Sequence, residues 1–519
     1  MDAGSIKLAA GVVSGFLIFL TGCASTPVVE TPTPTSSQLD PAVTARPEVT
    51  VEVRLVSTMV LTPTPQPSAT PTPLIPPLPI PTPAGPPFIY HTIAEGETLS
   101  YLALYYDTTI EQLVDLNDLA NSSAIIQTEQ LLRVPLQSDQ VAPSQLLLPD
   151  SEVVFSPAYL DFDIAAFVNS QAGYLSAYSQ YVNGQQLSGA EVVALVAEQF
   201  GVGPRLLLAL LEHYGGWVTN PQPPAELINQ PLGRRNPRGG DFYLALAFTA
   251  NRVNDGYYGY KRDGFWVFEL PDGNRAVTPE GLNAGTVGVQ NILALHSSWD
   301  VWQQELGPDG FMADYRALFG DPFQYTVEPV VPITLVQPEL TLPWAEGQGF
   351  YFTGGPHPAY AHGSGWAAID FGPPDVLGNC FYSAVPVTAA ADGVIVSARP
   401  GEIQLDLDGD GYIQTGWGLF YMHLALDSDK PVQPGQRVKE GDILGYASCE
   451  GGLSNSSHVH LARRYNGEWL EAGGPVPMVL SGWEVQPSLT PYGGTLKKGD
   501  QIREACECWE PDLNLVVRD

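Results

Sequence analysis

The chain has 519 residues, which is enough for three or four domains at about 150 residues each. Its 48 prolines exceed the usual share of about 5%, which predicts an extended linker beside the packed domains. With 23 basic and 56 acidic residues the net charge is −33, so binding to nucleic acid or to anionic head groups would lack its usual electrostatic contribution. Charged residues make up only 15% of the chain and apolar residues 44%, so most of the chain is expected to bury a core.

Residues 1–23 have the features of a secretory signal peptide. Lys7 precedes the apolar run 8–20, which is too short to span a bilayer but suits the apolar part of a signal peptide. The sequence Leu20-Thr21-Gly22-Cys23 resembles a bacterial lipobox, in which the cysteine is lipidated and becomes the new N-terminus. A plain secretory signal with a chance cysteine is the alternative. In both cases we expect the mature protein outside the cytoplasm, and the lipobox predicts a membrane anchor at Cys23.

Residues 24–87 are predicted to be a linker. Repeated Thr-Pro units, as at 31–34 and 62–65, remove hydrogen-bond donors and fix φ, which favours a polyproline-II spacer. A lipidated end followed by a stiff spacer indicates folded domains held away from a membrane.

Residues 88–137 are predicted to fold in the order strand, helix, helix, strand. The motifs Gly96-Glu97-Thr98-Leu99, Asn117 and Leu132-Arg133-Val134-Pro135 resemble those of a LysM domain, a βααβ module. Glu129 departs from the family pattern, which usually has Gly there. The resemblance implies binding of N-acetylglucosamine-containing glycans, and a βααβ domain without sugar affinity is the alternative. The glycan-binding candidates are Gly96, Thr98, Leu99 and Asn117.

Residues 155–325 are predicted to be mainly α-helical. The apolar helix that starts at Pro204 resembles the core helix of lysozyme-like transglycosylases, in which a glutamate is the general acid. Tyr214 stands in the place of that glutamate, and a phenol with a pKa of about 10 is a poor proton donor. Glu212 lies on another face of the helix. We therefore expect a non-catalytic lysozyme-like domain, acting either as a glycan platform or as a spacer with buried aromatic residues. The candidate platform residues are Trp217, Tyr257, Tyr258, Tyr260 and Trp266.

Residues 338–485 show alternating strands with Gly-centred turns, which predicts a mainly antiparallel β domain, and residues 486–519 are a C-terminal extension. His458 and His460 are two apart in a predicted strand, so they share one face while Val459 points into the core. Histidines and an aspartate gathered from different strands are the ligand types of a zinc site.

Three motifs in this region resemble the LytM/lysostaphin-type zinc metallopeptidases. They are Ala368-Ile369-Asp370-Phe371, Tyr421-Met422-His423-Leu424 and Ser457-His458-Val459-His460. The resemblance implies an antiparallel β fold of the duplicated hybrid motif type that cuts peptide bonds in peptidoglycan. It implies that Asp370 and His460 bind Zn²⁺, that His458 is the base for the attacking water, and that His423 orients the water and stabilises the oxyanion.

The sequence offers two histidines as candidates for the third zinc ligand. In the commonest family pattern it stands four residues before the aspartate, and here that position is Trp366. We favour His357, because relatives with a similar aspartate motif place this ligand after a Gly-Gly-x-His turn. His362, among glycines and a serine, is the alternative and is otherwise a surface histidine near the groove.

Two further features concern cysteines and acidic residues. Outside the cytoplasm the four cysteines beyond Cys23 suggest disulfides, and Cys380–Cys449 is favoured because Cys506-Glu507-Cys508 is too tight to close easily on itself. Asp406, Asp408 and Asp410 match the start of a calcium loop, yet its twelfth position is Trp417. An Asp/Gly hairpin turn is the stronger interpretation, and a Ca²⁺ site is the alternative.

Taken together, these features predict a lipid-anchored, zinc-dependent peptidoglycan endopeptidase that faces the cell wall. Its LysM domain would raise the local concentration of substrate at the active site. Its partners are then peptidoglycan glycan strands and stem peptides, and a membrane through the anchor. The rival hypothesis is a non-catalytic peptidoglycan-binding scaffold, or an activator of another cell-wall hydrolase.

Overall fold

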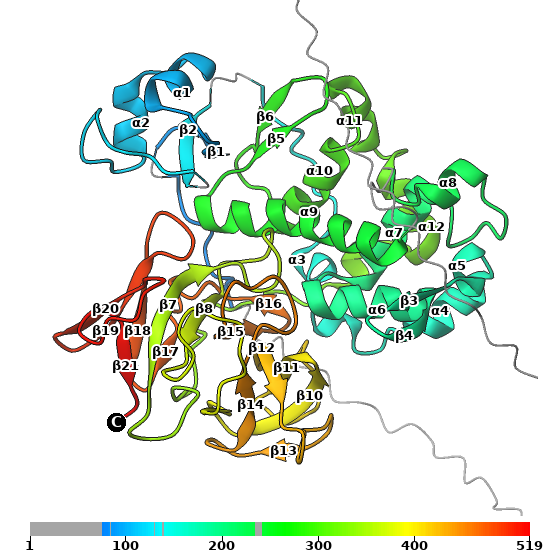
Figure 1. The fold of residues 1–519 in the computed structure, drawn as a ribbon. Coiled ribbons are helices and arrows are strands. Elements are labelled where there is room, and N and C mark those ends of the chain that lie inside the picture. Colours follow the sequence, from blue (N-terminus) through cyan, green and yellow to red (C-terminus); the bar gives the residue numbers. More distant parts are fainter. Residues whose placement is uncertain (1–74, 84, 129, 137–139, 234–240) are drawn as a thin grey trace, which may run out of the picture. The chain divides into compact units, whose positions relative to one another are not determined.

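The computed structural model describes residues 75–83, 85–128, 130–136, 140–233 and 241–519 (Figure 1). The predicted signal peptide with Cys23, the linker up to residue 74, and Glu129 lie outside this description. Within the described ranges, no helix has both the length and the apolar character that a membrane span requires.

The first folded module has the predicted βααβ order. It consists of β1 (Phe88–Thr92), α1 (Leu99–Tyr105), α2 (Ile110–Leu116) and β2 (Leu131–Pro135), with the two strands antiparallel. Both helices begin at threonine caps: Thr98 accepts a hydrogen bond from the backbone of Tyr101, and Thr109 forms a capping box with Gln112. A small apolar core that includes Leu102 closes the module.

The last part of the predicted linker pairs with a later segment of the chain. The backbone N–H of Leu78 donates to Val331 O at 3.0 Å, and that of Ile333 donates to Pro76 O at 2.9 Å. Leu78 packs against a small cluster that contains Val331 and Leu470. Residues 76–78 are therefore fixed to the folded part of the chain.

The middle region is mostly helical, with two short hairpins. Its elements are α3 (Asp150–Val153), η1 (Pro157–Tyr159), α4 (Ile164–Gln171), α5 (Tyr174–Ala177), β3 (Ser179–Val182), β4 (Gln185–Ser188), α6 (Gly189–Phe200), α7 (Pro204–Gly215), α8 (Ala225–Asn229), α9 (Phe242–Asp263), β5 (Val267–Glu269), β6 (Arg275–Val277), α10 (Ala284–Ala294), α11 (Trp299–Glu305), α12 (Phe311–Phe319) and η2 (Pro322–Tyr325). The long helix α9 begins at the Asp241 cap and ends at Gly264, which adopts the left-handed conformation. It packs closely on α10, because a Cβ at Gly288 would lie only 2.9 Å from Val253 O.

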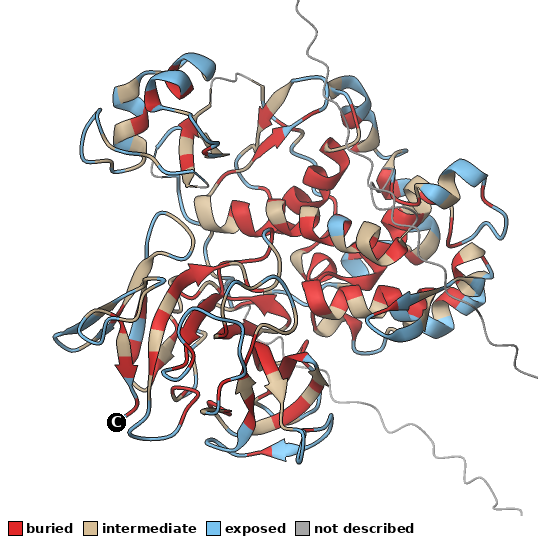
Figure 2. Cartoon of the chain, viewed as in Figure 1, coloured by how far each residue is buried: buried red, intermediate tan, exposed pale blue. Residues whose placement is uncertain are grey.

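The aromatic residues proposed as a glycan platform are mostly core residues. Trp217, Tyr257, Tyr258 and Tyr260 are each at most 5% exposed. Figure 2, viewed as Figure 1, shows buried residues along helix α9, which carries the three tyrosines. Side chains at such depth cannot stack on a sugar, so the structure favours the alternative of a helical region with buried aromatics. Trp266 differs from them in being only partly buried.

The residues at the end of α7 serve the fold. The Tyr214 hydroxyl is buried without a hydrogen-bond partner, and burial raises the pKa of this phenol above its usual value. The Glu212 carboxylate accepts hydrogen bonds from the backbone N–H groups of Val218 and Thr219 at 2.9 and 3.0 Å. It therefore caps the turn that follows its own helix, and neither residue is placed as a general acid.

The C-terminal region is built on an antiparallel sheet with the strand order β13-β10-β11-β12-β15-β8-β7-β21, and a small four-stranded sheet adjoins it. The strands are β7 (Gly349–His357), β8 (Ala368–Gly372), β9 (Pro386–Thr388), β10 (Gly393–Arg399), β11 (Gly401–Asp406), β12 (Trp417–Leu426), β13 (Arg437–Val438), β14 (Ile443–Ala447), β15 (Val459–Tyr465), β16 (Glu468–Trp469), β17 (Val479–Leu480), β18 (Trp483–Pro487), β19 (Gly494–Lys498), β20 (Gln501–Glu504) and β21 (Leu515–Val517). Since β21 pairs with β7 and Val516 is fully buried, the predicted C-terminal extension completes this sheet.

The central strands bury side chains on both faces. Along β12, Leu419 and Tyr421 belong to the core of the β region, whereas Phe420 and Met422 belong to the core of the helical region. This division follows from the two-residue period of a strand. One face of the sheet is therefore covered by the helical region.

Candidate metal centre

The candidate metal ligands come from three neighbouring strands of the sheet. His357 is the last residue of β7, Asp370 is the middle residue of β8, and His460 is the second residue of β15. The register places His460 directly opposite Asp370. Asp370 alternates with Ile369 and Phe371, which both point into the core of the β region, so its carboxylate lies on the other face.

The three side chains converge on one point. His357 Nε2 lies 3.3 Å from Asp370 Oδ1, and His460 Nδ1 lies 3.2 Å from the same oxygen. The two ring nitrogens are 3.0 Å apart. Ligands about 2.0–2.1 Å from a tetrahedral zinc ion are separated by roughly 3.3 Å, so this spacing fits zinc with a fourth position open.

Backbone carbonyls fix the tautomers of both histidines. His357 Nδ1 donates to Gly355 O at 2.8 Å, and His460 Nε2 donates to Ala359 O at 2.8 Å. Each ring therefore turns an unprotonated nitrogen toward the shared point. Asp370 Oδ1 is buried there without a hydrogen-bond donor. Three buried atoms with lone pairs face one another, and a bound cation satisfies all three.

The pKa values of these residues favour the protonation states that metal binding needs. Burial opposes ionisation of Asp370, but the facing imidazoles of His357 and His458 outweigh it and hold the pKa of this carboxyl well below its usual value. Burial is also the main reason that the pKa of His460 is lowered. An ionised Asp370 and a neutral His460 are forms in which these side chains bind a divalent metal.

Two further histidines border this point. His458 Nε2 lies 3.6 Å from Asp370 Oδ1, and its Nδ1 donates to Ser456 O at 2.9 Å. The ring of His423 lies 4.5 Å from that of His458, and its Nδ1 donates to Glu450 O at 2.8 Å. Burial, followed by the charges of the neighbouring histidines, lowers the pKa of His423 to about 3. In the neutral form of each ring, Nε2 is therefore the unprotonated nitrogen.

A β-bulge determines where His423 points. Gly401 pairs with Leu424 and Glu402 pairs with Met422, so His423 has no residue opposite it on β11. His423 also has a φ of +60°, which is rare outside glycine. Sequence analysis identified the histidine but carried no signal for the bulge.

His362 lies outside the metal group. Its ring accepts a hydrogen bond from the Asn251 side chain of α9, and the backbone N–H of Gly363 donates to Asn251 Oδ1 at 2.9 Å. The loop that carries His362 is therefore bound to helix α9. Of the two histidines that the sequence left open, the structure groups His357 with Asp370 and His460.

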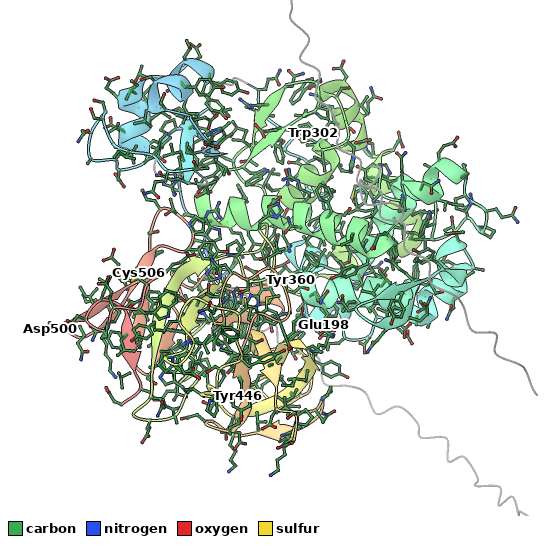
Figure 3. All side chains as sticks on the ribbon, viewed as in Figure 1. Glu198, Trp302, Tyr360, Tyr446, Asp500 and Cys506 are labelled. Carbon is green, nitrogen blue, oxygen red and sulfur yellow. A yellow bond between two sulfur atoms is a disulfide. The ribbon has the colours of Figure 1, made fainter. Side chains whose placement is uncertain are left out.

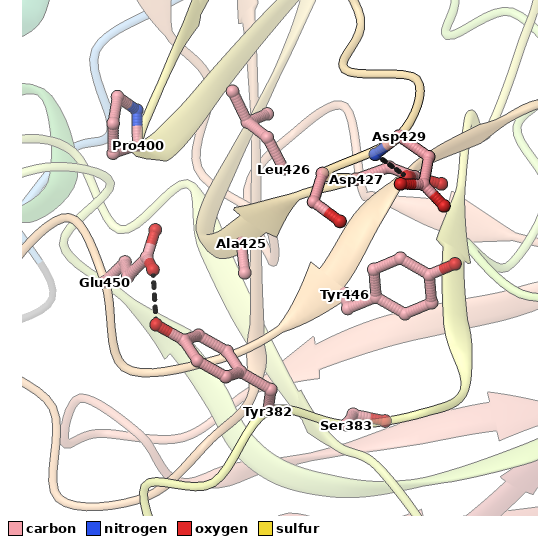
Figure 4. Close-up of a pocket in the computed structure, with 10 residues that line it drawn as sticks. Tyr382, Ser383, Pro400, Ala425, Leu426, Asp427, Asp429, Tyr446 and Glu450 are labelled. Atoms are coloured by element: carbon pink, nitrogen blue, oxygen red, sulfur yellow. Dashed lines mark hydrogen bonds between the residues drawn. The ribbon is translucent and has the colours of Figure 1, made fainter.

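The candidate ligands open into a cavity of about 1290 Å³. Helix α9 and the loop after it supply part of the cavity lining, through Arg252, Asp255, Tyr258, Arg262 and Trp266. Sequence analysis missed these residues, because they lie about a hundred residues before the candidate ligands in the chain. A second cavity of about 630 Å³ lies beside the Glu450 side chain, where the Tyr382 hydroxyl donates to Glu450 Oε1 at 2.8 Å (Figure 4).

The aspartates of the suggested calcium loop stabilise a turn between β11 and β12. Asp406 accepts hydrogen bonds from the backbone N–H groups of Asp408 at 3.0 Å and Gly411 at 2.7 Å. Asp410 accepts from the backbone of Tyr412 at 2.9 Å. These are the contacts of an Asp/Gly hairpin turn, the stronger of the two sequence-based interpretations.

The four LysM candidates have different roles in the structure. Asn117 joins α2 to β2, because its amide donates to Leu113 O and Arg133 O and accepts from the Arg133 backbone. Leu99 is a core residue, and Thr98 caps α1. Gly96 has a φ of +85° and open space around it. Gly96 and Thr98 lie in the turn between β1 and α1, and the Asn117 and Leu99 side chains serve the fold.

The structure joins Cys380 to Cys449, the pair that the sequence favoured. It also joins Cys506 to Cys508, which differs from the expectation that one intervening residue is too few. The Cα atoms of this second pair are 5.1 Å apart, a separation that a disulfide spans.

An antiparallel sheet that gathers two histidines and an aspartate beside two further histidines defines a metallopeptidase-type centre. Family comparisons agree with this class. The Peptidase family M23 matches residues 380–472, the LysM domain matches 91–135, and the LasA N-terminal domain matches 146–332. The chain thus carries an N-terminal LysM domain and a LytM-type peptidase domain of the M23 family. The M23 match contains His423, His458 and His460, while His357 and Asp370 precede it.

Individual relatives are similar over larger parts of the chain. Protease LasA from two strains of Pseudomonas aeruginosa is 24% identical over 333 residues, which covers 60% of this chain and 72% of the relative. Among solved structures, the M23 metalloprotease pseudoalterin is 21% identical with a TM-score of 0.28, covering 35% of this chain and all of that one. The catalytic domain of lysostaphin from Staphylococcus simulans is 25% identical with a TM-score of 0.17, covering 24% of this chain and 88% of that one. The helical region matches LasA, and its likeness to lysozyme stays a prediction.

Proposed function

We propose that this protein is a zinc-dependent metalloendopeptidase that hydrolyses peptide bonds in peptidoglycan. The observation that carries this proposal is the convergence of His357 Nε2, His460 Nδ1 and the donor-free Asp370 Oδ1. The M23 match supports a peptidase, and the LysM match supports peptidoglycan as the substrate.

The chain's own residues then have separate tasks. A zinc ion held by His357, Asp370 and His460 would supply Lewis acidity toward the scissile carbonyl and the attacking water. His458 accepts the water proton at Nε2, because its Nδ1 proton is engaged with Ser456 O. His423 donates at Nδ1 to Glu450 O, so its Nε2 orients the water by accepting a second hydrogen bond. The depressed pKa of His423 keeps it neutral for this task.

The proposal also assigns roles to the other parts of the chain. The predicted lipid anchor at Cys23 would hold the protein on the outer side of a membrane, facing the cell wall. The LysM domain would keep the peptidase near its substrate, and the helical region would contribute no glycosidase chemistry, since Tyr214 cannot replace a carboxylic acid.

The deciding experiment incubates the zinc-loaded full chain with isolated sacculi and identifies the new amino and carboxyl termini. We expect new peptide termini in the presence of zinc and none with a chelator. Asp370→Asn, which keeps the shape of the ligand, serves as the matched inactive variant. Peptide cleavage that survives both the chelator and Asp370→Asn would exclude a metallopeptidase, and a zinc-loaded chain that releases no termini would favour the scaffold hypothesis.

Glycan binding is tested separately from cleavage. Residues 88–136 are expected to sediment with peptidoglycan in the presence of a chelator, and their recovery in the supernatant would contradict the LysM role. Release of reducing ends by the Asp370→Asn chain would contradict the non-catalytic assignment of the helical region and would point to Glu212.

A further inference from the structure

Strand β11 presents polar side chains to the helical region. Ile403 and Leu405 point into the core of the β region, so Glu402 and Gln404 lie on the opposite face. Both are buried, and Glu402 is only 6% exposed. A carboxylate at this depth requires hydrogen-bond donors from the surrounding elements.

Helix α6 supplies one of the donors to Glu402. The Gln199 amide donates to the two carboxylate oxygens of Glu402 at 3.2 and 3.3 Å. The Tyr243 hydroxyl of α9 donates to Gln199 Oε1 at 3.0 Å, which leaves the Gln199 NH₂ group facing the carboxylate. Next to it, Glu198, which Figure 3 labels on helix α6, accepts from Arg399 at 2.8 Å. The helical region thus holds Glu402 together with Arg399 of β10, which donates to Glu402 Oε2 at 3.4 Å.

Glu402 is connected to the metal ligand His460 through one loop. The Tyr360 hydroxyl donates to Glu402 Oε1 at 3.2 Å. Tyr360 directly follows Ala359, whose carbonyl accepts from His460 Nε2. Ala359, whose carbonyl sets the tautomer of His460, is therefore the residue directly before Tyr360, which contacts Glu402.

Glu402 is connected to His423 through the β-bulge. The bulge lies between Gly401 and Glu402, directly opposite His423. At Gly401 the backbone approaches the next loop so closely that a Cβ would lie 2.2 Å from Gly451 N. The adjoining carbonyl of Glu450 accepts from His423 Nδ1. Movement of β11 at Glu402 would therefore displace both the backbone and the ring partner of His423.

We infer that Glu402 is a positioning residue through which Gln199 of the helical region sets the orientation of His423 and His460. This inference rests on the proposed peptidase function and adds a second part of the chain to its active site. Neither Gln199 nor Glu402 lines the cavity, so both act through other residues and touch no substrate.

The test compares two full-chain variants that each remove hydrogen bonding between the helical region and a buried glutamate of the β region. Gln199→Leu removes the Gln199 amide from Glu402, which keeps Tyr360 and Arg399 as donors. Tyr257→Phe removes a 2.9 Å hydrogen bond to Glu468, which keeps Lys261 as a partner. We expect Gln199→Leu to lower kcat about tenfold to a hundredfold with KM and zinc content unchanged, the size of effect that a displacement of about 1 Å produces. Tyr257→Phe should leave kcat within about twofold.

A rescue variant separates positioning from general loss of packing. In the exchange Gln199→Glu with Glu402→Gln, the donor and the acceptor trade places, and the Tyr243 hydroxyl still finds an oxygen to donate to. We expect this double variant to recover most of the kcat that Gln199→Leu loses. If both chains fold and the kcat of the double variant is no higher than that of Gln199→Leu, the inference is overturned.

A readout independent of activity uses the zinc-free chain labelled with ¹⁵N-histidine. We expect the Nδ1–H resonance of His423 to shift or broaden in Gln199→Leu and to stay unchanged in Tyr257→Phe. An unchanged resonance in Gln199→Leu, or a kcat that falls equally in both variants, would overturn the inference. If the wild-type chain binds zinc but cleaves nothing, the proposed function fails, and the resonance still decides whether Glu402 positions His423.

Discussion

Two groups of side chains among the described residues could hold a metal ion, and they differ in what already satisfies their atoms. In the first, Asp370 Oδ1 is buried without a donor, and the two histidines turn unprotonated nitrogens toward it. In the second, Asp406 accepts several backbone hydrogen bonds of its own turn. Three ligand-type residues close together thus indicate a metal site only where their lone pairs lack other partners.

The carboxylates of the two groups also titrate in opposite directions. Asp370 faces imidazoles, and its pKa lies well below the usual value despite burial. Asp408 is exposed, but partial desolvation of its carboxyl and the neighbouring Asp406 raise its pKa to about 6. The carboxylate that faces imidazoles therefore stays ionised in acid, whereas the carboxylate beside other carboxylates takes up a proton at a higher pH.

The largest expected effect comes from breaking the first group. Asp370→Asn and His357→Ala should each lose zinc and lower kcat/KM more than a thousandfold, since the loss of one of three protein ligands leaves an incomplete metal site. Zinc content by mass spectrometry and release of peptide termini from sacculi measure both effects. His362→Ala is the matched control and should keep its zinc. Loss of zinc in His362→Ala with retention in His357→Ala would reverse the assignment of the ligand.

Zinc itself should stabilise the folded chain. At a free zinc concentration a thousandfold above the dissociation constant, binding to the folded state alone adds about 4 kcal/mol to the free energy of unfolding. Urea unfolding with and without a chelator measures this difference, and Asp370→Asn should show none of it. Equal stabilisation of Asp370→Asn by zinc would place the metal elsewhere in the chain.

Acid should destabilise the zinc-free chain through His423. Its folded pKa of about 3 lies below the unfolded value of about 6.5, so between these values the unfolded state binds a proton that the folded state does not. The free energy of unfolding should therefore fall by about 1.4 kcal/mol for each pH unit below 6.5 on account of this residue. Unfolding of the chelated chain at pH 7, 6 and 5 tests it. His423→Asn should flatten the slope by about that amount, and an unchanged slope would contradict it.

The smallest effect is expected at the acidic turn. Adding Ca²⁺ should leave the melting temperature unchanged, because the turn already satisfies Asp406. Asp408 has a raised folded pKa, so its contribution to stability is present in acid and is lost as the pH rises from about 4 to about 6. Asp408→Asn should remove this small dependence. A Ca²⁺-dependent rise in melting temperature that disappears in Asp408→Asn would restore the calcium interpretation.

The sequence was most informative for site residues that combine a ligand-type side chain with the two-residue spacing of a strand. The two-residue spacing of His458 and His460 placed both on one face, and Val459 is fully buried as this alternation requires. The Gly-Gly-Pro sequence pointed to His357, which the structure places with Asp370, although these residues lie in strand β7 and not in a turn. These predictions needed only local geometry and a family motif.

The sequence was least informative where distant elements meet. The positive φ of His423 depends on a bulge in a neighbouring strand, and no local pattern marks it. Glu402 has the appearance of an ordinary strand residue, because its partner Gln199 lies about two hundred residues earlier in the chain. Trp217 and Tyr257 were candidates for an exposed glycan platform but are core residues. Aromatic residues at helical spacing occur both on surfaces and in cores, so the sequence alone does not distinguish the two.

The Cys380–Cys449 disulfide has a practical consequence for how the protein is prepared. The bond closes a loop of 69 residues, which corresponds to about 4 kcal/mol of chain entropy removed from the unfolded state. It also anchors the segment in which Asn379 O accepts from the backbone of Ser457 and Phe381 O accepts from the Ser457 hydroxyl, directly before His458. Production in a reducing cytosol, or storage with dithiothreitol, would free this segment while leaving the histidines intact. Refolding and assay buffers without thiols are therefore a condition for measuring the activity of the native site.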